Sequence, residues 1–497
     1  RNSSKPVGLG IDVLFLEYTF VFRESKDYLN PRKMKKSTFT CLVLLLLLCI
    51  QSVHANTFND YRTDFRDEAI YFVITTRFYD GDASNNTQCW DNQKANTGDP
   101  AWRGDFKGLI DKMDYIKALG FTAIWIPPVV ENASGYDYHG YHASNFSKVD
   151  KRYESSDVDF QTVIEEAHKR GMKIILDIVL NHTGNFGEEH LCKEFTRDWT
   201  ANPSDIDACM IPYTKSQGGT LPDDYAEEAS GTQYNHRLYL MKNNDGINHD
   251  SNNYWHHRAD FNWDDYTRWY AQIAGDCVDL NTENPAVYDY LIKCYGSFIK
   301  MGVDGFRIDT SGHIPRLAFD KVFVPAFQKL GNEYASKRLN GCPFYMFGEV
   351  CARFQGSVTY RGVPALSPYF YTWHSDDALK KEWNSDSTYW KNIDIKAATT
   401  EPSLENEKLE LQEYNANTSE STQPTSNNVF LNGNAYHTPD YSKASGFNVI
   451  DFPVHYSFNN VGNVWGLCTG GDKYYNDASF NVVYVDSHDY SPAPNDG

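Results

Sequence analysis

Residues 302–309 read Gly-Val-Asp-Gly-Phe-Arg-Ile-Asp, and this stretch decides the fold and the chemistry expected of the chain. Its valine, phenylalanine and isoleucine supply the apolar bulk of a buried strand, and Gly305 lets another backbone approach closely. Arg307 and Asp309 are two residues apart, so on a strand their side chains share one face. A guanidinium beside a carboxylate keeps that carboxylate ionised. The pair is therefore either a structural ion pair or a nucleophile held at a strand end.

Similar apolar runs recur along the chain, alternate with helical patterns, and mostly end in polar or charged residues. Alternating strands and helices predict a parallel sheet, and chemistry at the carboxyl ends of buried strands is typical of a (β/α)8 TIM barrel. A doubly wound sheet is the alternative, but no glycine-rich phosphate loop follows the first strand. The strand candidates are 69–74, 121–126, 173–180, 302–309, 344–347, 448–452 and 480–489, and the helical patterns are 105–119, 159–169, 286–301 and about 317–337.

Two long stretches interrupt this rhythm. Residues 185–265 are rich in Asn, Asp, Tyr and Trp and are too long for a simple loop, so they predict an inserted domain after the third strand. The catalytic barrel would then comprise 56–184 and 266–497, with a second long insertion at 352–447. No eighth strand is visible before Gly497, so we expect the barrel to be incomplete at the C-terminus.

The N-terminus has the pattern of an exported protein. Residues 34–36 are Met-Lys-Lys, 41–50 form a short apolar run, and 53–55 are Val-His-Ala, so 34–55 are predicted to be a signal peptide. The run is too short to span a bilayer, so no stable membrane insertion is expected. Residues 1–33 are interpreted as an upstream extension outside the fold. The protein is expected to be secreted, to the cell exterior or the periplasm.

The charge of the chain limits the class of partner, and its cysteine count bears on disulfides. The net charge is −20 and the pI is about 5.1, which argues against nucleic acid as a partner. Ten cysteines fall to eight when the two in the signal peptide are removed, an even number that permits disulfides such as Cys192 with Cys209.

If the strands form one barrel, their carboxyl ends meet in one pocket. Three carboxylates in a confined site cannot all stay ionised, so one should have a raised pKa. Arg307 is close to Asp309 in the sequence, whereas no cation adjoins Glu349, so Asp309 is the expected nucleophile and Glu349 the expected proton donor. A retaining glycosidase uses such a pair, roughly 5–5.5 Å apart. The pocket would hold Asp309, Glu349, Asp489, Arg307, His182, His313 and His488.

The motifs that carry these residues resemble those of the α-amylase family of glycoside hydrolases. The likeness runs from about residue 67 to the end, apart from the insertions, and its motifs are specific. The matching segments are 177–182 (DIVLNH), 302–313, 348–350 (GEV), 485–489 (VDSHD) and Asp279-Leu280.

The resemblance implies a retaining, endo-acting α-amylase that cleaves α-1,4-glucosidic bonds in starch or glycogen and works as a monomer. A cyclodextrin- or pullulan-acting hydrolase and a glucanotransferase share the same barrel and stay open as alternatives. From another class, an inactive carbohydrate-binding barrel is a further alternative, although such relatives typically lose a carboxylate and this chain has all three.

The resemblance also implies individual roles. Asp309 is the nucleophile, Glu349 the general acid/base, and Asp489 the third carboxylate, which grips sugar hydroxyls and stabilises the transition state. Arg307 holds Asp309 ionised, and Tyr141 stacks on the reacting sugar. Three histidines bind hydroxyls of that sugar: His182, His313 and His488.

Calcium is the implied cofactor. The family site between barrel and inserted domain maps to Asn181, Asp279 and the carbonyl of His313, where the cation would clamp the insertion onto the barrel. The oxygen-rich loop at 80–86 could bind a second hard cation or be a polar turn, since Asp and Asn suit both. The family's second site maps there, to Asp80, Asp82, Asn85, Asn86 and Asp105.

Three positions depart from the common family pattern. Gly312 stands where many members have lysine, a contact on the leaving-group side of the cleavage point. Ser487 replaces a frequent asparagine, and Pro127 a threonine or serine. None of these changes removes a catalytic group.

Overall fold

A six-stranded parallel sheet forms the centre of the described chain, in the order β1-β2-β5-β8-β9-β12. Each strand pairs with the one that follows it in this sheet along the sequence, so the winding never reverses direction. A doubly wound sheet reverses at a switch point, whereas a (β/α)8 barrel adds its strands consecutively. The order therefore favours the barrel. A parallel bridge between Ile450 and Val482 continues the series beyond β12.

The structure, a computed structural model, describes part of the 497 residues. The predicted extension (1–33) and signal peptide (34–55), the Cys192–Cys209 pair and most of both insertions lie outside the described residues. Among the residues that are described, no helix is both long and apolar enough to cross a membrane. The described ranges are 62–86, 104–132, 138–184, 254–350 without 257, 259, 264–265 and 274–276, 358–360, 363–365, 369–372, 445–450, 452, 461–463, 481–484 and 487–489.

The elements follow the predicted alternation of strands and helices. The sheet strands are β1 (Ile70–Phe72), β2 (Ala123–Ile126), β5 (Lys173–Val179), β8 (Gly305–Asp309), β9 (Tyr345–Gly348) and β12 (Asn448–Val449). The helices are α3 (Thr75–Phe78), α4 (Phe106–Ala118), α5 (Phe160–Lys169), α9 (Pro285–Met301), α10 (Arg316–Ala318), the π-helix η9 (Phe319–Phe323) and α11 (Val324–Glu333). The 3-10 turns are η1 (Phe65–Asp67), η2 (Lys151–Tyr153), η7 (Tyr266–Trp269), η8 (Ser311–His313), η10 (Ala335–Lys337), η11 (Leu339–Gly341) and η12 (Tyr369–Thr372).

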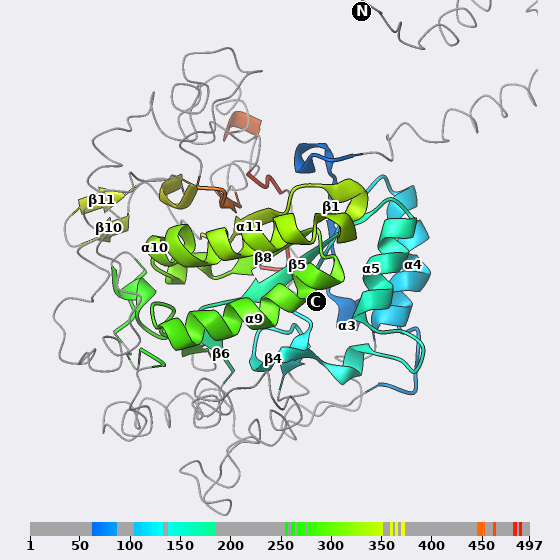
Figure 1. Ribbon diagram of the computed structural model, residues 1–497, viewed down its shortest axis with the longest axis horizontal. Helices are drawn as coiled ribbons and strands as arrows, with labels where there is room; N and C mark the ends of the chain where they lie inside the picture. Colours follow the sequence, from blue (N-terminus) through cyan, green and yellow to red (C-terminus); the bar gives the residue numbers. More distant parts are fainter. Residues whose placement is uncertain are drawn as a thin grey trace, which may run out of the picture. The chain divides into compact units, whose positions relative to one another are not determined.

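Side chains on the two faces of the sheet belong to two separate cores. One face packs against the helices, of which α9 and α11 lie across the sheet while α4 and α5 lie side by side (Figure 1). The other face encloses a smaller cluster that includes Trp125, Ile175 and Phe347. Because strand side chains alternate, Arg307 and Asp309 share a face that is opposite to that of their buried neighbours Phe306 and Ile308. The charged groups of β8 therefore lie on the same side of the sheet as the smaller cluster.

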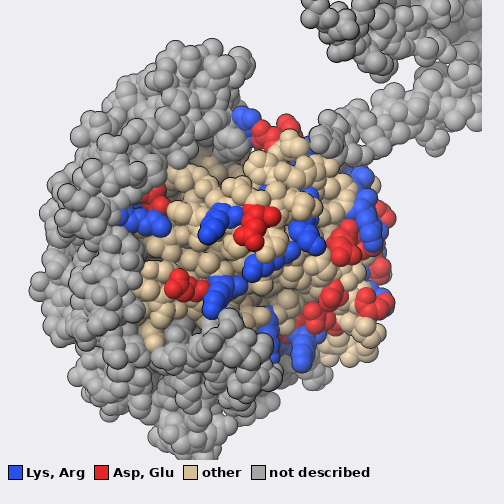
Figure 2. Space-filling view, viewed as in Figure 1, with Lys and Arg blue, Asp and Glu red and all other residues tan. Residues whose placement is uncertain are grey.

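Local capping explains where the main helices begin and end. Asp105 caps α4 by accepting a hydrogen bond from the backbone of Gly108, and Asp159 caps α5 in the same way. Proline occupies the first turn of α9, and Gly302 ends that helix with φ 117°, a left-handed conformation that suits glycine. The turn at Gly302 leads the chain directly into β8. On the outer face shown in Figure 2, basic and acidic side chains are interspersed over the described residues.

Three short antiparallel pairs accompany the sheet. β3 (Val130–Asn132) pairs with β4 (Ala143–Val149), and β10 (Val358–Tyr360) pairs with β11 (Val363–Ala365). β6 (His182–Thr183) pairs with β7 (Val278–Asp279), which brings residues on both sides of the predicted inserted domain together. The domain boundaries themselves stay a prediction, since residues 185–253 are outside the described part.

Candidate active site

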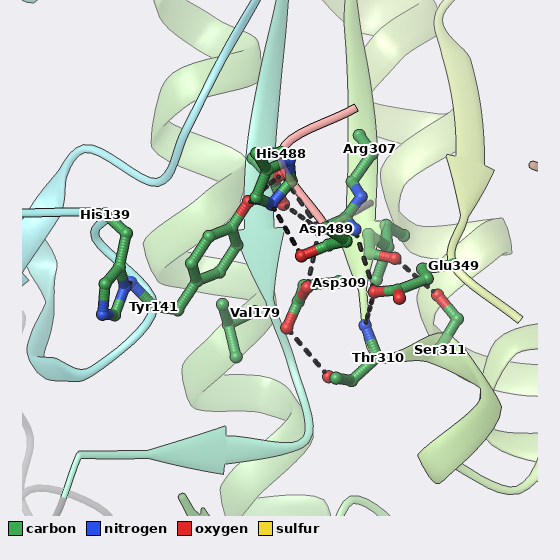
Figure 3. A network of polar contacts seen from close by, with 12 residues as sticks. His139, Tyr141, Val179, Arg307, Asp309, Thr310, Ser311, Glu349, His488 and Asp489 are labelled. Atoms are coloured by element: carbon green, nitrogen blue, oxygen red, sulfur yellow. Dashed lines mark hydrogen bonds and ion pairs between the residues drawn. The ribbon is translucent and has the colours of Figure 1, made fainter. Parts of the chain in front are cut away.

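Arg307 is the centre of a buried charge network at the carboxyl ends of β5, β8 and β9 (Figure 3). Its Nη1 contacts both carboxylate oxygens of Asp177 at 3.0 Å and Oδ1 of Asp309 at 2.6 Å. Its Nη2 donates to Oε2 of Glu349 at 2.9 Å. Three carboxylates from three neighbouring strands thus share one guanidinium, which brings Asp309 and Glu349 together as the sequence predicted.

Asp177 belongs to this network although the sequence analysis gave it no role. It faces Arg307 in the register of β5 and β8, and it also accepts hydrogen bonds of 3.0 Å from Trp125 Nε1 and the Tyr141 hydroxyl. Burial raises the pKa of Asp177 to about 8, while the charge of Arg307 opposes that change. The signal was present in the sequence, because an aspartate inside the apolar run 173–180 has to find partners when the strand is buried.

The residue after Asp309 is held in a rare conformation. Thr310 has φ 45°, in the left-handed region that a β-branched residue seldom adopts. Its hydroxyl contacts Oδ2 of Asp309 at 3.1 Å and also Oδ1 of Asn181. Strain of this kind persists only where the surroundings enforce it, and it clusters at functional sites. Thr310 therefore orients the Asp309 carboxylate, and the sequence offered no signal for its backbone conformation.

Glu349 follows directly after β9, and of the three carboxylates that contact Arg307 it is the one that lines the pocket. Burial raises the pKa of Glu349 to about 6; Arg307 opposes this change, whereas the negative charge of Asp309 reinforces it. The sequence-based reason for separating the two roles, that a cation adjoins Asp309 alone, does not hold in space, because Arg307 contacts both carboxylates. The raised pKa of Glu349 comes instead from its burial close to a second carboxylate.

His488 and Asp489 complete the described set from the far end of the chain. The His488 ring stacks on Phe72 and, at 3.1 Å through Nε2, contacts the Tyr141 hydroxyl. Burial lowers the pKa of His488 to about 3, so the ring is neutral. Burial also raises the pKa of Asp489, and the charge of Glu349 adds to this effect. Arg307, Glu349 and Asp489 all line one pocket that opens to solvent, so the structure joins these groups around one space.

The remaining predicted sugar-binding residues lie at two places. His182 contacts the carbonyl of Tyr141 at 2.9 Å through Nε2, and the Tyr141 ring lies parallel to that of His488. His139, which the sequence analysis did not single out, stacks on Tyr141 as well. His313 is held by other partners: it stacks on Phe261, and its Nδ1 contacts the carbonyl oxygen of Arg268 at 3.2 Å.

Two of the three predicted ligands of the first calcium site, Asn181 and Asp279, lie close together. The backbone amide of Leu280 donates to the Asn181 carbonyl at 2.7 Å, so Asn181 and Asp279 lie on adjacent segments of the chain. The Asn181 Nδ2 atom is buried without a hydrogen-bond partner, and Oδ2 of Asp279 contacts His256 Nδ1 at 2.6 Å. Across the described ranges, no cluster of three or more His, Cys, Asp or Glu side chains is arranged to hold a metal ion. An amide, a carboxylate and a carbonyl still fit calcium, which prefers oxygen ligands.

The second predicted calcium loop has protein partners for its oxygens. Asp105 accepts from the backbone amides of Gly81, Asp82 and Gly108, as expected of a helix cap. Within the loop, Asp80 accepts from Asn86 at 2.8 Å; Asp82 accepts from Ser84, and the amide of Asn85 donates to the carbonyl of Glu154. These contacts account for the loop as a capped polar turn. A cation at this place stays a prediction from the sequence.

Comparisons with known proteins identify a matching family and several similar proteins. The α-amylase catalytic-domain family matches residues 72–353. The chain is 30% identical over 342 residues to a β/α-amylase of Paenibacillus polymyxa (66% of this chain, 23% of that protein) and 31% identical over 301 residues to a cyclomaltodextrin glucanotransferase of Klebsiella oxytoca (58% and 38%). An α-amylase structure from Geobacillus thermoleovorans, complexed with acarbose, shares 28% identity (59% and 49% covered, TM-score 0.38). The chain thus spans less than half the length of each relative.

Proposed function

The chain belongs to the α-amylase family of glycoside hydrolases, and from this premise we propose that it is an endo-acting α-amylase. Its substrate would be an α-1,4-linked glucan such as starch or glycogen, and the anomeric configuration would be retained. The observation that carries the proposal is the sharing of Arg307 by Asp309 and Glu349. A nucleophile and an acid, both positioned by one cation, are the two groups that a retaining glycosidase needs.

The mechanism follows from the different environments of the two carboxyl groups. Asp309, paired with Arg307 at 2.6 Å, attacks the anomeric carbon and forms the glycosyl-enzyme ester. Glu349 gives its proton to the departing glycosidic oxygen, which a raised pKa makes possible near neutral pH. Glu349 then takes a proton from water, whose oxygen attacks the same carbon and releases Asp309. Arg307 holds the attacking carboxylate of Asp309 in place through its 2.6 Å contact.

The other predicted residues would hold the reacting sugar. Asp489, with 46% of its side chain exposed, is able to accept hydrogen bonds from sugar hydroxyls. His488 is neutral, so its ring can donate one hydrogen bond and accept another. Both ring nitrogens of His182 contact protein oxygens, so we place His182 on the sugar by the family resemblance. We place His313 on the same sugar by the family resemblance alone. Stacking of Tyr141 on the sugar rests on the same resemblance.

We also propose that calcium binds Asn181, Asp279 and the carbonyl of His313. These residues come from the two sides of the predicted inserted domain and from the turn after β8. The cation would neutralise the buried Asp279 carboxylate and link the three segments, which is a structural contribution. Removing calcium with a chelator should lower Tm, and Asp279→Asn should abolish that response. An unchanged Tm in a protein shown to be calcium-free would contradict this site.

Relatives of two activities match this chain at similar identity, so product analysis separates the alternatives. A hydrolase releases linear maltooligosaccharides from starch, whereas a glucanotransferase forms cyclic products or transfers chains between acceptors. A pullulan- or cyclodextrin-acting enzyme would degrade those substrates faster than starch. Secretion, which the residues at 34–55 predict, is part of the proposal and is tested by finding the mature protein outside the cell.

Reducing-sugar release from soluble starch tests the function itself. Wild-type protein should release sugar, and Asp309→Asn should lose several orders of magnitude, since removing a nucleophile removes the covalent route. Asp289→Asn, an exposed change of the same kind on α9, is the matched control and should retain full activity. If wild type and Asp309→Asn were equally silent while folded, the chain would be a carbohydrate-binding barrel instead.

A further inference from the structure

A buried arginine from a distant segment grips the turn that follows β8. Arg268 lies in η7 and is 2% exposed. Its Nε donates to the carbonyl oxygen of Gly312 at 2.8 Å, and its own carbonyl oxygen contacts Nδ1 of His313 at 3.2 Å. One residue therefore holds the turn η8 at two successive positions, from a segment that precedes β7 in the chain.

Arg268 leaves no room for a side chain at Gly312. A Cβ atom added to Gly312 would collide with Nη2 of Arg268 and would lie 3.5 Å from the Cα of Val350. Gly312 does not have a positive φ, so its backbone conformation would be open to other residues. Space is therefore what requires glycine here. The lysine that many family members carry at this position could not be accommodated while Arg268 is in place.

Gly312 links the guanidinium to the backbone of Glu349. The amide of Gly312 donates to the carbonyl oxygen of Glu349 at 3.1 Å, and the amide of Glu349 donates to the carbonyl oxygen of Ile308 at 2.9 Å. The acid/base residue is thus tied on one side to β8 and on the other to the turn that Arg268 grips. A shift of Gly312 would be transmitted to the segment from which the Glu349 side chain extends.

We propose that Arg268 is a positioning residue for Glu349: it holds Gly312, and Gly312 fixes the backbone that carries the acid/base carboxyl group. The inference rests on the proposed function, because it assigns a consequence to the position of Glu349. Arg268 is buried and acts through the turn rather than on the sugar. A misplacement of a catalytic group by about 1 Å can reduce a rate on the order of 100-fold, so losing the contact between Arg268 and Gly312 should change the rate measurably.

A double-mutant cycle tests the contact. Gly312→Ala should lower both Tm and kcat, because the new methyl group displaces the guanidinium. In the Arg268→Ala background the space is vacated, so the same methyl group should cost much less. The double variant should therefore be more stable and more active than the product of the two single effects predicts. Strict additivity in Tm and in kcat would overturn the proposal.

Two kinds of leaving group test the route through Glu349. A sugar is a poor leaving group, so cleavage of a maltooligosaccharide needs the proton of Glu349. A nitrophenol is a good leaving group and departs readily without that proton. Arg268→Ala should therefore lower kcat on maltooligosaccharides on the order of 10- to 100-fold, and should lower it far less on a 4-nitrophenyl α-maltooligosaccharide. Equal losses on both substrates would contradict a role in positioning the acid.

Arg338→Ala is the matched control. Arg338 is also a buried arginine that donates to backbone carbonyls, at 2.7 Å to Cys342 and 2.6 Å to Gly331, but it is not part of the site. This variant should lose stability, keep the leaving-group ratio of wild type, and fail to rescue Gly312→Ala. If Arg268→Ala behaved like Arg338→Ala, its role would be structural. The Tm cycle is readable without any activity, so a failure of the proposed function would be recognised separately.

Discussion

The two ends of the parallel sheet both bury charge, but with a different balance. At the amino end, Lys173 and Arg62 both pair with Glu68; with the nearby Asp304, this end has two cations and two carboxylates. At the carboxyl end, one cation, Arg307, faces the carboxylates of Asp177, Asp309 and Glu349. β5 contributes Lys173 to one end and Asp177 to the other, and Asp304 directly precedes β8, which carries Arg307 and Asp309. The comparison shows that strand burial alone does not decide what a buried charge does.

The partners of each carboxylate explain the difference. At the amino end, Asp304 accepts hydrogen bonds from the backbone amides of Ile174 and Leu339 and contacts His168 at 2.8 Å, so its charge is fully met. At the carboxyl end, burial raises the pKa values of Asp177 and Glu349, which share one guanidinium. A balanced cluster stabilises the fold, whereas a surplus of carboxylates keeps a proton available for chemistry.

The largest expected effect comes from removing the shared cation. Arg307→Met would leave three buried carboxylates without their partner, and breaking such a buried pair costs about 3–5 kcal/mol in the free energy of unfolding. Activity per folded molecule should also disappear, because Asp309 and Glu349 would lose the contact that positions both of them. Denaturant unfolding and starch hydrolysis would measure the two effects. A variant that stayed as stable as wild type would show that the carboxyl-end cluster is not held by Arg307.

A smaller effect is expected at the amino end. Asp304→Asn would set an amide NH2 group against one of its hydrogen-bond donors and remove the charge, which should cost about 1–3 kcal/mol. Activity per folded molecule should remain that of wild type, because this end of the strands carries no reacting group. Measuring kcat at a temperature well below Tm separates the two quantities. A loss of kcat without a loss of stability would show that the amino end of the sheet also serves catalysis.

The sequence predicted much of this arrangement because local patterns determined it. Alternation within β8 correctly placed Arg307 and Asp309 on one face, and the helical pattern predicted at 105–119 corresponds to α4. The barrel winding and the meeting of Asp309 with Glu349 followed from the repeated strand ends. Each of these inferences needed only residues adjacent in the sequence and one rule about parallel strands.

What the sequence did not reveal depends on contacts between distant segments. Asp177 became part of the site through its register with Arg307, and Arg268 through the space at Gly312. Neither contact has a spacing rule. The assignment of protonation was reached for a wrong reason, since Arg307 contacts Glu349 as well as Asp309. Burial, which decides the pKa of Glu349, is a property of the folded chain alone.

The smallest expected change in stability is a gain, and it comes from removing one surplus carboxylate. The pKa of Glu349 is raised from 4.5 to about 6, so the folded protein binds this proton more tightly than the unfolded chain. The unfolding free energy therefore falls as pH rises from about 4.5 to about 6, and the loss corresponds to about 2 kcal/mol above that window. Glu349→Gln removes the charge, and its amide can donate to Asp309.

Glu349→Gln should therefore be more stable than wild type at pH 7, by about 1–2 kcal/mol, and equal to it below pH 4.5. Activity should be lost by a factor on the order of 10² to 10⁴, the contribution typical of a general acid. In wild type, kcat/KM should fall above about pH 6, as Glu349 loses its proton. Unfolding curves of both proteins at several pH values give the measurement. If the variant were less stable than wild type at every pH, Glu349 would belong with the balanced charges of the amino end.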